Sequence, residues 1–100
     1  MKPYVVYFGV GGGYGGIDSA HLIYAEDEEE AEAYASDRAT ESCESYGIGE
    51  DTETIEDYWE EINRWAVYEV EEYTGNQEQI DKMISYGFTN ETDIDIKGSY

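Results

Sequence analysis

Two short apolar segments near the N-terminus predict a pair of β-strands. Residues Tyr4 to Val10 are aromatic or β-branched apart from Gly9, and a run of this length is typical of a buried strand. The segment from Ser19 to Ala25 predicts a second strand. The glycine-rich loop between them, residues 11–16, permits a tight reversal of the chain, so we expect the two strands to pair antiparallel.

A long helix is expected directly after the second strand, from about Glu28 to Tyr46. Asp27 occupies an N-cap position, with Glu30 three residues later as its capping-box partner. Glycines at positions 47 and 49 end the helix. Small residues spaced by four predict an inward stripe that lets the helix lie close to a sheet: Ala31, Ala35, Ala39 and Cys43.

The segment from Thr52 to Thr74 fits two descriptions. Its apolar residues share one helical face for about five turns, which favours a single long helix. Its second half is rich in β-forming residues, with Ala66, Tyr68 and Val70 in alternation, which favours a strand. We expect a helix from about Thr54 to Asn63 and then a third strand, because two strands alone make a marginal sheet. One long helix is the alternative.

The C-terminal part of the chain predicts a short helix followed by a polar segment. Asn76 can cap an apolar helix that ends near Gly87. Residues 89–100 are expected to be an edge strand or a mobile tail. The whole pattern predicts an α+β fold, in which residues 1–88 form one compact domain with a small antiparallel sheet of about three strands. Two to three helices are expected to pack mainly on one face of that sheet.

The charge balance excludes several classes of function. The chain has 100 residues with 25 Asp plus Glu against 5 Lys plus Arg, for a formal net charge of −20. Direct binding to nucleic acid or to an anionic membrane is excluded, because both need clustered Lys and Arg. With 40% hydrophobic and 15% aromatic residues the chain should nevertheless fold. A single cysteine and no apolar run near 18 residues favour a cytoplasmic protein.

Two local patterns resemble ligand-binding motifs but lack other parts that those motifs need. Glycines 11, 13 and 16 match a dinucleotide-binding fingerprint, but a strand follows them and no cation lies nearby, so a flexible hairpin loop is preferred. Asp93-x-Asp95-x-Lys97-Gly98 resembles the first half of a calcium loop. It lacks the distal bidentate Glu, and Lys97 stands where an oxygen ligand is needed. We therefore predict neither a cofactor nor a metal site.

Catalytic residues are not predicted either. His21 falls in a predicted strand, where a packed or edge position is expected. Cys43 lies on the small-residue stripe with no basic residue near enough to activate its thiol. Carboxylates are so numerous that acid/base pairs arise by chance, and a catalytic pair needs a cleft that separates their pKa values. The prediction is a protein that is not an enzyme.

The negative charge is concentrated in one part of the chain. Between Glu26 and Glu72 there are 19 acids and only Arg38 and Arg64 as bases, so this block carries −17 of the net charge. The first helix together with its N-cap, Asp27 to Tyr46, has 8 carboxylates along about 30 Å, about one per 4 Å. Phosphates on one DNA strand are spaced by about 3.4 Å along the axis. Like charges four residues apart destabilise a helix by a few tenths of a kcal/mol, so the charge does not serve stability.

The chain resembles a type of small acidic protein from bacteriophages and mobile elements, the DNA-mimicking inhibitors that include anti-restriction and anti-CRISPR proteins. The resemblance rests on size, on the opening Tyr4-Val5-Val6-Tyr7-Phe8-Gly9, and on the aromatic residues interleaved with the acidic block: Tyr34, Tyr46, Tyr58, Trp59, Trp65 and Tyr68. It implies inhibition of a nucleic-acid-binding defence complex, first of all a CRISPR effector, in the cytoplasm of a bacterial host cell. The inhibitor would occupy the positively charged groove of that complex.

Carboxylates of the two acidic helices are the expected partner-binding residues: Glu28, Glu29, Glu32, Asp37, Glu41, Glu44, Asp57, Glu60 and Glu61. Two other functions stay open. The chain could be a structural or adaptor protein of a virion or host assembly, for which the acidity only gives solubility, including in a high-salt cytoplasm. It could also bind divalent cations. A homodimer formed through the aromatic surface is compatible with each of these functions.

Overall fold

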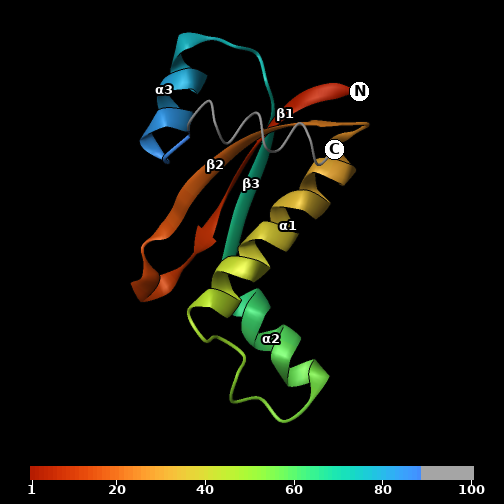
Figure 1. Ribbon diagram of the computed structural model, residues 1–100, viewed down its shortest axis with the longest axis vertical. Coiled ribbons are helices and arrows are strands. Elements are labelled where there is room, and N and C mark those ends of the chain that lie inside the picture. The colour runs from red at the N-terminus through yellow and green to blue at the C-terminus, as the bar shows by residue number, and fades with distance from the viewer. Residues whose placement is uncertain (89–100) are drawn as a thin grey trace.

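The structure, a computed structural model, describes residues 1–88 of the chain (Figure 1). Three strands form one antiparallel sheet, β1 (Lys2–Val10), β2 (Gly16–Ala25) and β3 (Ala66–Glu72), in the order β2-β1-β3. The predicted α+β class and the antiparallel pairing are confirmed. The expected edge strand or tail at 89–100, with its calcium-like motif, lies outside the described residues.

The central position of β1 explains its uninterrupted apolar sequence. Val6 pairs with His21 of β2 on one side and with Val70 of β3 on the other. Every residue of β1 from Tyr4 to Val10 is buried. A strand covered on both faces needs apolar side chains at successive positions, because neighbouring residues point to opposite faces.

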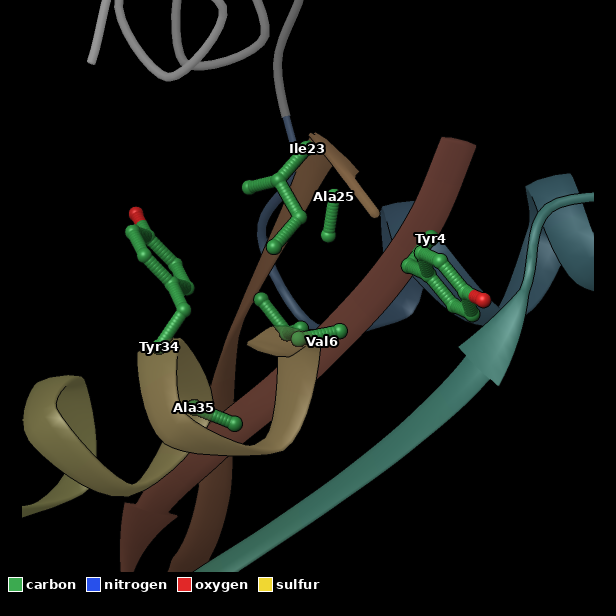
Figure 2. Packing of buried hydrophobic residues seen from close by; sticks show 7 residues of the cluster. Tyr4, Val6, Ile23, Ala25, Tyr34 and Ala35 are labelled. Atoms are coloured by element: carbon green, nitrogen blue, oxygen red, sulfur yellow. The ribbon is translucent and has the colours of Figure 1, made fainter. Parts of the chain in front are cut away.

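Helix α1 (Glu28–Ser45) covers one face of the sheet, as its small-residue stripe predicts. The Asp27 side chain caps it by accepting a hydrogen bond from the Glu30 amide at 2.9 Å. Figure 2 shows Val6 and Ile23 of the sheet beside Tyr34 and Ala35 of α1. The predicted stripe is confirmed, since its four members are all fully buried: Ala31, Ala35, Ala39 and Cys43.

The ambiguous segment is a helix followed by a strand. Helix α2 (Ile55–Trp65) begins after Thr54, whose side chain accepts a hydrogen bond from the Asp57 amide at 3.1 Å. The backbone becomes extended at Ala66, where β3 starts. The preferred prediction is thus confirmed, with the helix ending two residues later than expected. Ile62 anchors α2 in a cluster with residues of β1, α1 and the loop after α1: Val10, Cys43 and Ile48.

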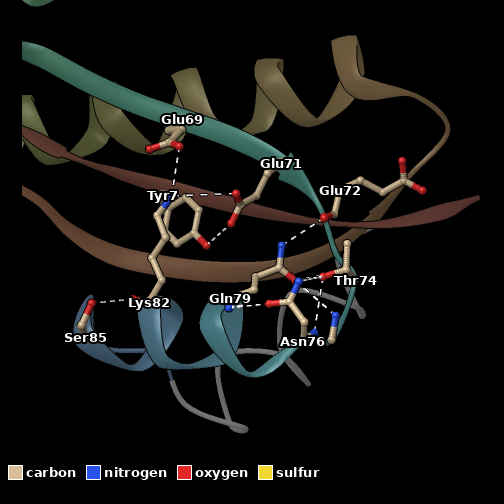
Figure 3. A network of polar contacts seen from close by, with 10 residues as sticks. Tyr7, Glu69, Glu71, Glu72, Thr74, Asn76, Gln79, Lys82 and Ser85 are labelled. Carbon is tan, nitrogen blue, oxygen red and sulfur yellow. Dashed lines mark hydrogen bonds and ion pairs between the residues drawn. The ribbon is translucent and has the colours of Figure 1, made fainter.

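Helix α3 (Gln77–Ser85) packs on the face of the sheet opposite α1, so that only two of the three helices share a face. Met83 of α3 is buried against Val5, Tyr7 and Leu22. Figure 3 shows the sheet between α1 and α3. The reason is the apolar character of β1 on both faces: Val5 and Tyr7 would be left in water without α3.

A polar network holds α3 to the sheet (Figure 3). The hydroxyl of Tyr7, a fully buried residue, donates a hydrogen bond to Glu71. Lys82 of α3 lies 3.0 Å from an oxygen of Glu69 and 4.5 Å from the centre of the Tyr7 ring. Gln79 accepts from the Thr74 amide at 2.8 Å and donates to the Glu72 carbonyl at 3.0 Å. Each of these three polar side chains therefore has a partner.

Candidate functional site

The predicted partner-binding carboxylates lie at the surface. All six on α1 are exposed, as are Asp57 and Glu60 on α2, whereas Glu61 is half-buried. The helix geometry separates those on α1 into groups, because successive residues turn by about 100°. Asp37, Glu41 and Glu44 lie within about 60° of one another on one side of the helix, Glu28 and Glu32 lie on the opposite side, and Glu29 lies between the two groups. They do not form one row.

Three of the predicted carboxylates already have partners within the protein. Glu41 pairs with Arg38 at 2.7 Å. Glu44 accepts a hydrogen bond from the Tyr58 hydroxyl at 2.5 Å, which links α1 to α2. That hydrogen bond, together with some desolvation and the charge of Glu44, raises the pKa of Tyr58 to about 12. The Glu44–Tyr58 hydrogen bond therefore uses one of these carboxylates to hold the two helices together.

Glu61 is the third carboxylate with a partner. It accepts from the indole nitrogen of Trp65 at 3.2 Å and lies 3.4 Å from Arg64. Within residues 1–88 no ion pair or side-chain hydrogen bond engages the remaining carboxylates: Glu28, Glu29, Glu32, Asp37, Asp57 and Glu60.

The single histidine and the single cysteine are packed groups. His21 lies half-buried on β2, with its Nδ1 2.6 Å from the Tyr34 hydroxyl oxygen. Burial, reinforced by the charge of Arg38, lowers the pKa of His21 to about 4. Burial also raises the pKa of the Cys43 thiol, with a smaller contribution from Glu44. At neutral pH the imidazole and the thiol are therefore both uncharged.

Within residues 1–88, no three His, Cys, Asp or Glu side chains are close enough together to hold a metal ion. None of the helices in this part of the chain has the length and apolar content needed to cross a membrane.

The structure also forms a cavity that the sequence did not predict. It has a volume of about 440 Å³ and lies between the β1–β2 hairpin tip, the loop after α1, and α2. Three aromatic rings and two carboxylates line it, and we call it the aromatic pocket: Tyr14, Tyr46, Trp65, Asp51 and Glu61, with Thr52 and residues 47–49. Tyr14 lies 4.9 Å from the Tyr46 ring and 5.9 Å from the Trp65 ring, centre to centre.

The glycine-rich loop builds one wall of the aromatic pocket. The Gly11 amide donates to the Trp65 carbonyl at 2.7 Å. Gly12 has a positive φ of 64°, and a Cβ there would lie 2.2 Å from the Trp65 ring, closer than any side chain allows. The glycines thus permit a close approach of the hairpin to Trp65, which is a packing role rather than the phosphate-binding role of the motif they resemble.

A second cavity of about 370 Å³ adjoins the aromatic pocket and shares Asp51, Thr52 and Glu61 with it. Its lining brings together the three predicted carboxylates of α2, Asp57, Glu60 and Glu61, with Arg64. Tyr14 and Asp51 are surface residues that the sequence analysis did not single out. The one signal for Tyr14 is that it is the only aromatic residue among glycines 11–16.

Two surface features are thus available for binding, the exposed carboxylates of α1 and α2 and the aromatic pocket. Both favour a positively charged partner, because their charged groups are predominantly carboxylates. The chain matches no protein-family model, and comparisons with curated proteins and with solved structures also find no match.

Proposed function

We propose that the protein inhibits a nucleic-acid-binding defence complex, first of all a CRISPR effector, by occupying the basic groove that otherwise holds nucleic acid. The observation that supports the proposal is the set of exposed carboxylates on α1 and α2 that no cation within residues 1–88 neutralises. A groove that binds phosphates must present Lys and Arg, so it is the natural partner for such a surface.

The axial spacing of the carboxylates on α1 determines how closely they could match the phosphates of a DNA strand. Asp37, Glu41 and Glu44 follow one side of the helix at axial intervals of about 6 and 4.5 Å, given a rise of about 1.5 Å per residue. Those intervals are between one and two phosphate steps along one DNA strand. The carboxylates of that side therefore span about 10 Å, and Glu28, Glu29 and Glu32 are needed to extend the match along α1. The net charge of −20 would also steer a basic partner toward the protein.

A competition assay tests this function. Purified CRISPR effectors and restriction enzymes are mixed with labelled target DNA and increasing amounts of the protein, at about 0.15 M salt. We expect the release of DNA from at least one complex at a stoichiometric amount of the protein. If every complex keeps its DNA, the inhibitor function is wrong.

Charge-reversed variants then test the position of the carboxylates. The first variant changes Glu32, Asp37 and Glu60 to Lys; these exposed residues make no side-chain hydrogen bond or ion pair within residues 1–88. The matched control changes three exposed acids away from α1 and α2: Asp18, Glu78 and Asp81. Each reversal changes the charge by two, so both variants go from −20 to −14.

Inhibition should be lost in the first variant and largely kept in the control, because a mimic needs its charges where the partner expects phosphates. Equal inhibition by the two folded variants would show that only total charge matters and would contradict mimicry.

One observation favours an adaptor as a second candidate function. Ile55 and Trp59 on α2 are 76% and 47% exposed, and large apolar side chains on a surface are typical of protein contacts. An adaptor that binds through these side chains should keep its affinity as salt rises from about 0.15 to 0.5 M. Binding to a basic groove should instead weaken steeply over that range. The salt dependence of the partner's affinity therefore distinguishes the two functions.

A further inference from the structure

We propose that the aromatic pocket binds a guanidinium group, the side chain of an arginine on a partner protein. The proposal does not depend on the inhibitor function, because an arginine can be bound whether or not its owner binds nucleic acid. It is carried by the combination of aromatic rings, carboxylates and a cavity at one place.

The charge of the pocket selects a cation. Asp51 and Glu61 contribute two carboxylates to the lining, and neither Lys nor Arg lines it within residues 1–88. An anion such as phosphate would be repelled by both carboxylates. A neutral apolar ligand would partly desolvate both carboxylates and would leave Asp51 without a partner, at a cost in free energy. A cationic ligand avoids both penalties.

The aromatic rings favour a guanidinium over a compact ammonium ion. Tyr14 and Tyr46 are 42% and 52% exposed, and with Trp65 they place three ring surfaces around the cavity. A guanidinium is planar, so it can stack on a ring while its edge N–H groups point toward a carboxylate. An ammonium ion is more strongly hydrated and has no flat face to stack. Cation–π attraction acts on both and is strongest for Trp among the aromatic residues.

Two cationic side chains of the protein itself also lie beside both an aromatic ring and a carboxylate. The Arg38 guanidinium carbon lies 5.2 Å from the centre of the Tyr34 ring while the group pairs with Glu41. Lys82 lies 4.5 Å from the centre of the Tyr7 ring and pairs with Glu69. An aromatic ring and a carboxylate therefore both lie beside each of these two partly buried cations. The aromatic pocket offers that combination on the surface, to a side chain from outside.

The pocket is also well supported by the structure beneath it. The hairpin is tied to Trp65 through the Gly11 amide, and Trp65 in turn donates to Glu61. Ile48, in the loop that forms another wall, is buried beside Ile62. Because several walls are anchored before any ligand arrives, little conformational freedom is lost on binding.

The probe for the test is Nα-acetylarginine amide, with Nα-acetylcitrulline amide as an uncharged analogue of nearly the same shape. Binding to the full chain is followed by ¹H–¹⁵N NMR at about 0.15 M salt. The indole N–H of Trp65 and the amides of Gly47 and Gly49 report on the pocket. We expect saturable shifts of these signals with the arginine compound. The citrulline compound and Nα-acetyllysine amide should bind at least about fivefold more weakly.

Two pairs of variants test whether the arginine probe binds in the aromatic pocket rather than elsewhere on the protein. Tyr46→Ala should weaken binding of the arginine probe about fivefold or more, whereas Tyr68→Ala, a change at a similarly exposed tyrosine outside the pocket, should not. Glu61→Gln should weaken binding several-fold, and Glu32→Gln on α1 should not. The ¹H–¹⁵N spectrum of each variant shows whether it is folded.

Three results would overturn the proposal. The citrulline compound could bind as well as the arginine compound, which would show that the positive charge of the guanidinium does not contribute to binding. The lysine compound could bind as well, which would make the pocket a general cation site. The arginine probe could shift signals over all acidic surfaces without saturation, which would show that the pocket does not bind it. None of these results bears on DNA release in the competition assay.

Discussion

Replacing Tyr7 by Phe tests whether the polar network between the sheet and α3 stabilises the fold. Tyr7 has no exposed surface, and its hydroxyl donates to Glu71, a residue 64 positions away in the chain. The ring itself packs against Tyr86 at 5.5 Å, centre to centre, and against Lys82. Phe keeps the ring and these contacts, so the variant removes the hydroxyl and little else.

The expected loss of stability follows from the charge and the exposure of the acceptor. A hydrogen bond to a charged group contributes about 1.5–3 kcal/mol. Glu71 is 33% exposed and lies 3.8 Å from Lys82, so water and the ammonium group can partly replace the hydroxyl. The lower part of the range, about 1.5–2 kcal/mol, is therefore expected. For a chain of this size that loss lowers the melting temperature by about 6–16 °C.

Urea unfolding at pH 7, followed by circular dichroism at 222 nm, measures the change. The midpoint should fall while the slope with urea stays constant, because the surface exposed on unfolding is unchanged. Tyr68→Phe is the control, since Tyr68 is 47% exposed, and it should stay within about 0.5 kcal/mol of the wild type. A double-mutant cycle with Glu71→Ala should give a coupling free energy of at least about 1 kcal/mol. A loss below about 0.5 kcal/mol for Tyr7→Phe, or no coupling, would refute the reasoning.

Two further predictions concern pH and salt. His21 has its pKa lowered to about 4 in the folded protein, so the unfolded chain binds a proton first as pH falls below about 6.5. The stability advantage of the wild type over His21→Gln should be present above that pH and be lost toward pH 4; a constant difference would contradict it. The melting temperature should rise between 0.1 and 1 M sodium chloride, because the Debye length falls from about 10 to 3 Å and screens the crowded acids. A flat or falling melting temperature would show that repulsion among them is weak.

The features that depend only on residues close together in the sequence could be predicted from it. Asp27 and Thr54 cap their helices through side chains that reach an amide three residues later, which is a local contact. The stripe from Ala31 to Cys43 is read from its spacing alone, because a helix repeats every 3.6 residues. The exposure of the acidic residues follows in the same way, since carboxylates on an amphipathic helix face water.

The features that join distant parts of the chain were decided by the tertiary structure. Local preference left residues 66–72 open between helix and strand, and pairing with the central strand β1 makes them β3. The same strand needs cover on both faces, so α3 lies opposite α1, while α1 and α2 lie on the other face as expected. A pattern of apolar residues shows that a strand is buried, but it does not say which helix covers which face.

The aromatic pocket shows most clearly the difference between local features, which the sequence predicts, and contacts between distant residues, which the tertiary structure decides. Its rings come from residues 14, 46 and 65, and each is an ordinary aromatic residue within its own segment. They meet because the hairpin tip reaches the junction of α2 and β3, where the missing side chain of Gly12 leaves room for Trp65. The sequence by itself determined the local elements and the sign of the surface charge. Only the tertiary structure decided which rings and carboxylates share a cavity, because side chains far apart in the chain meet only when the whole core packs.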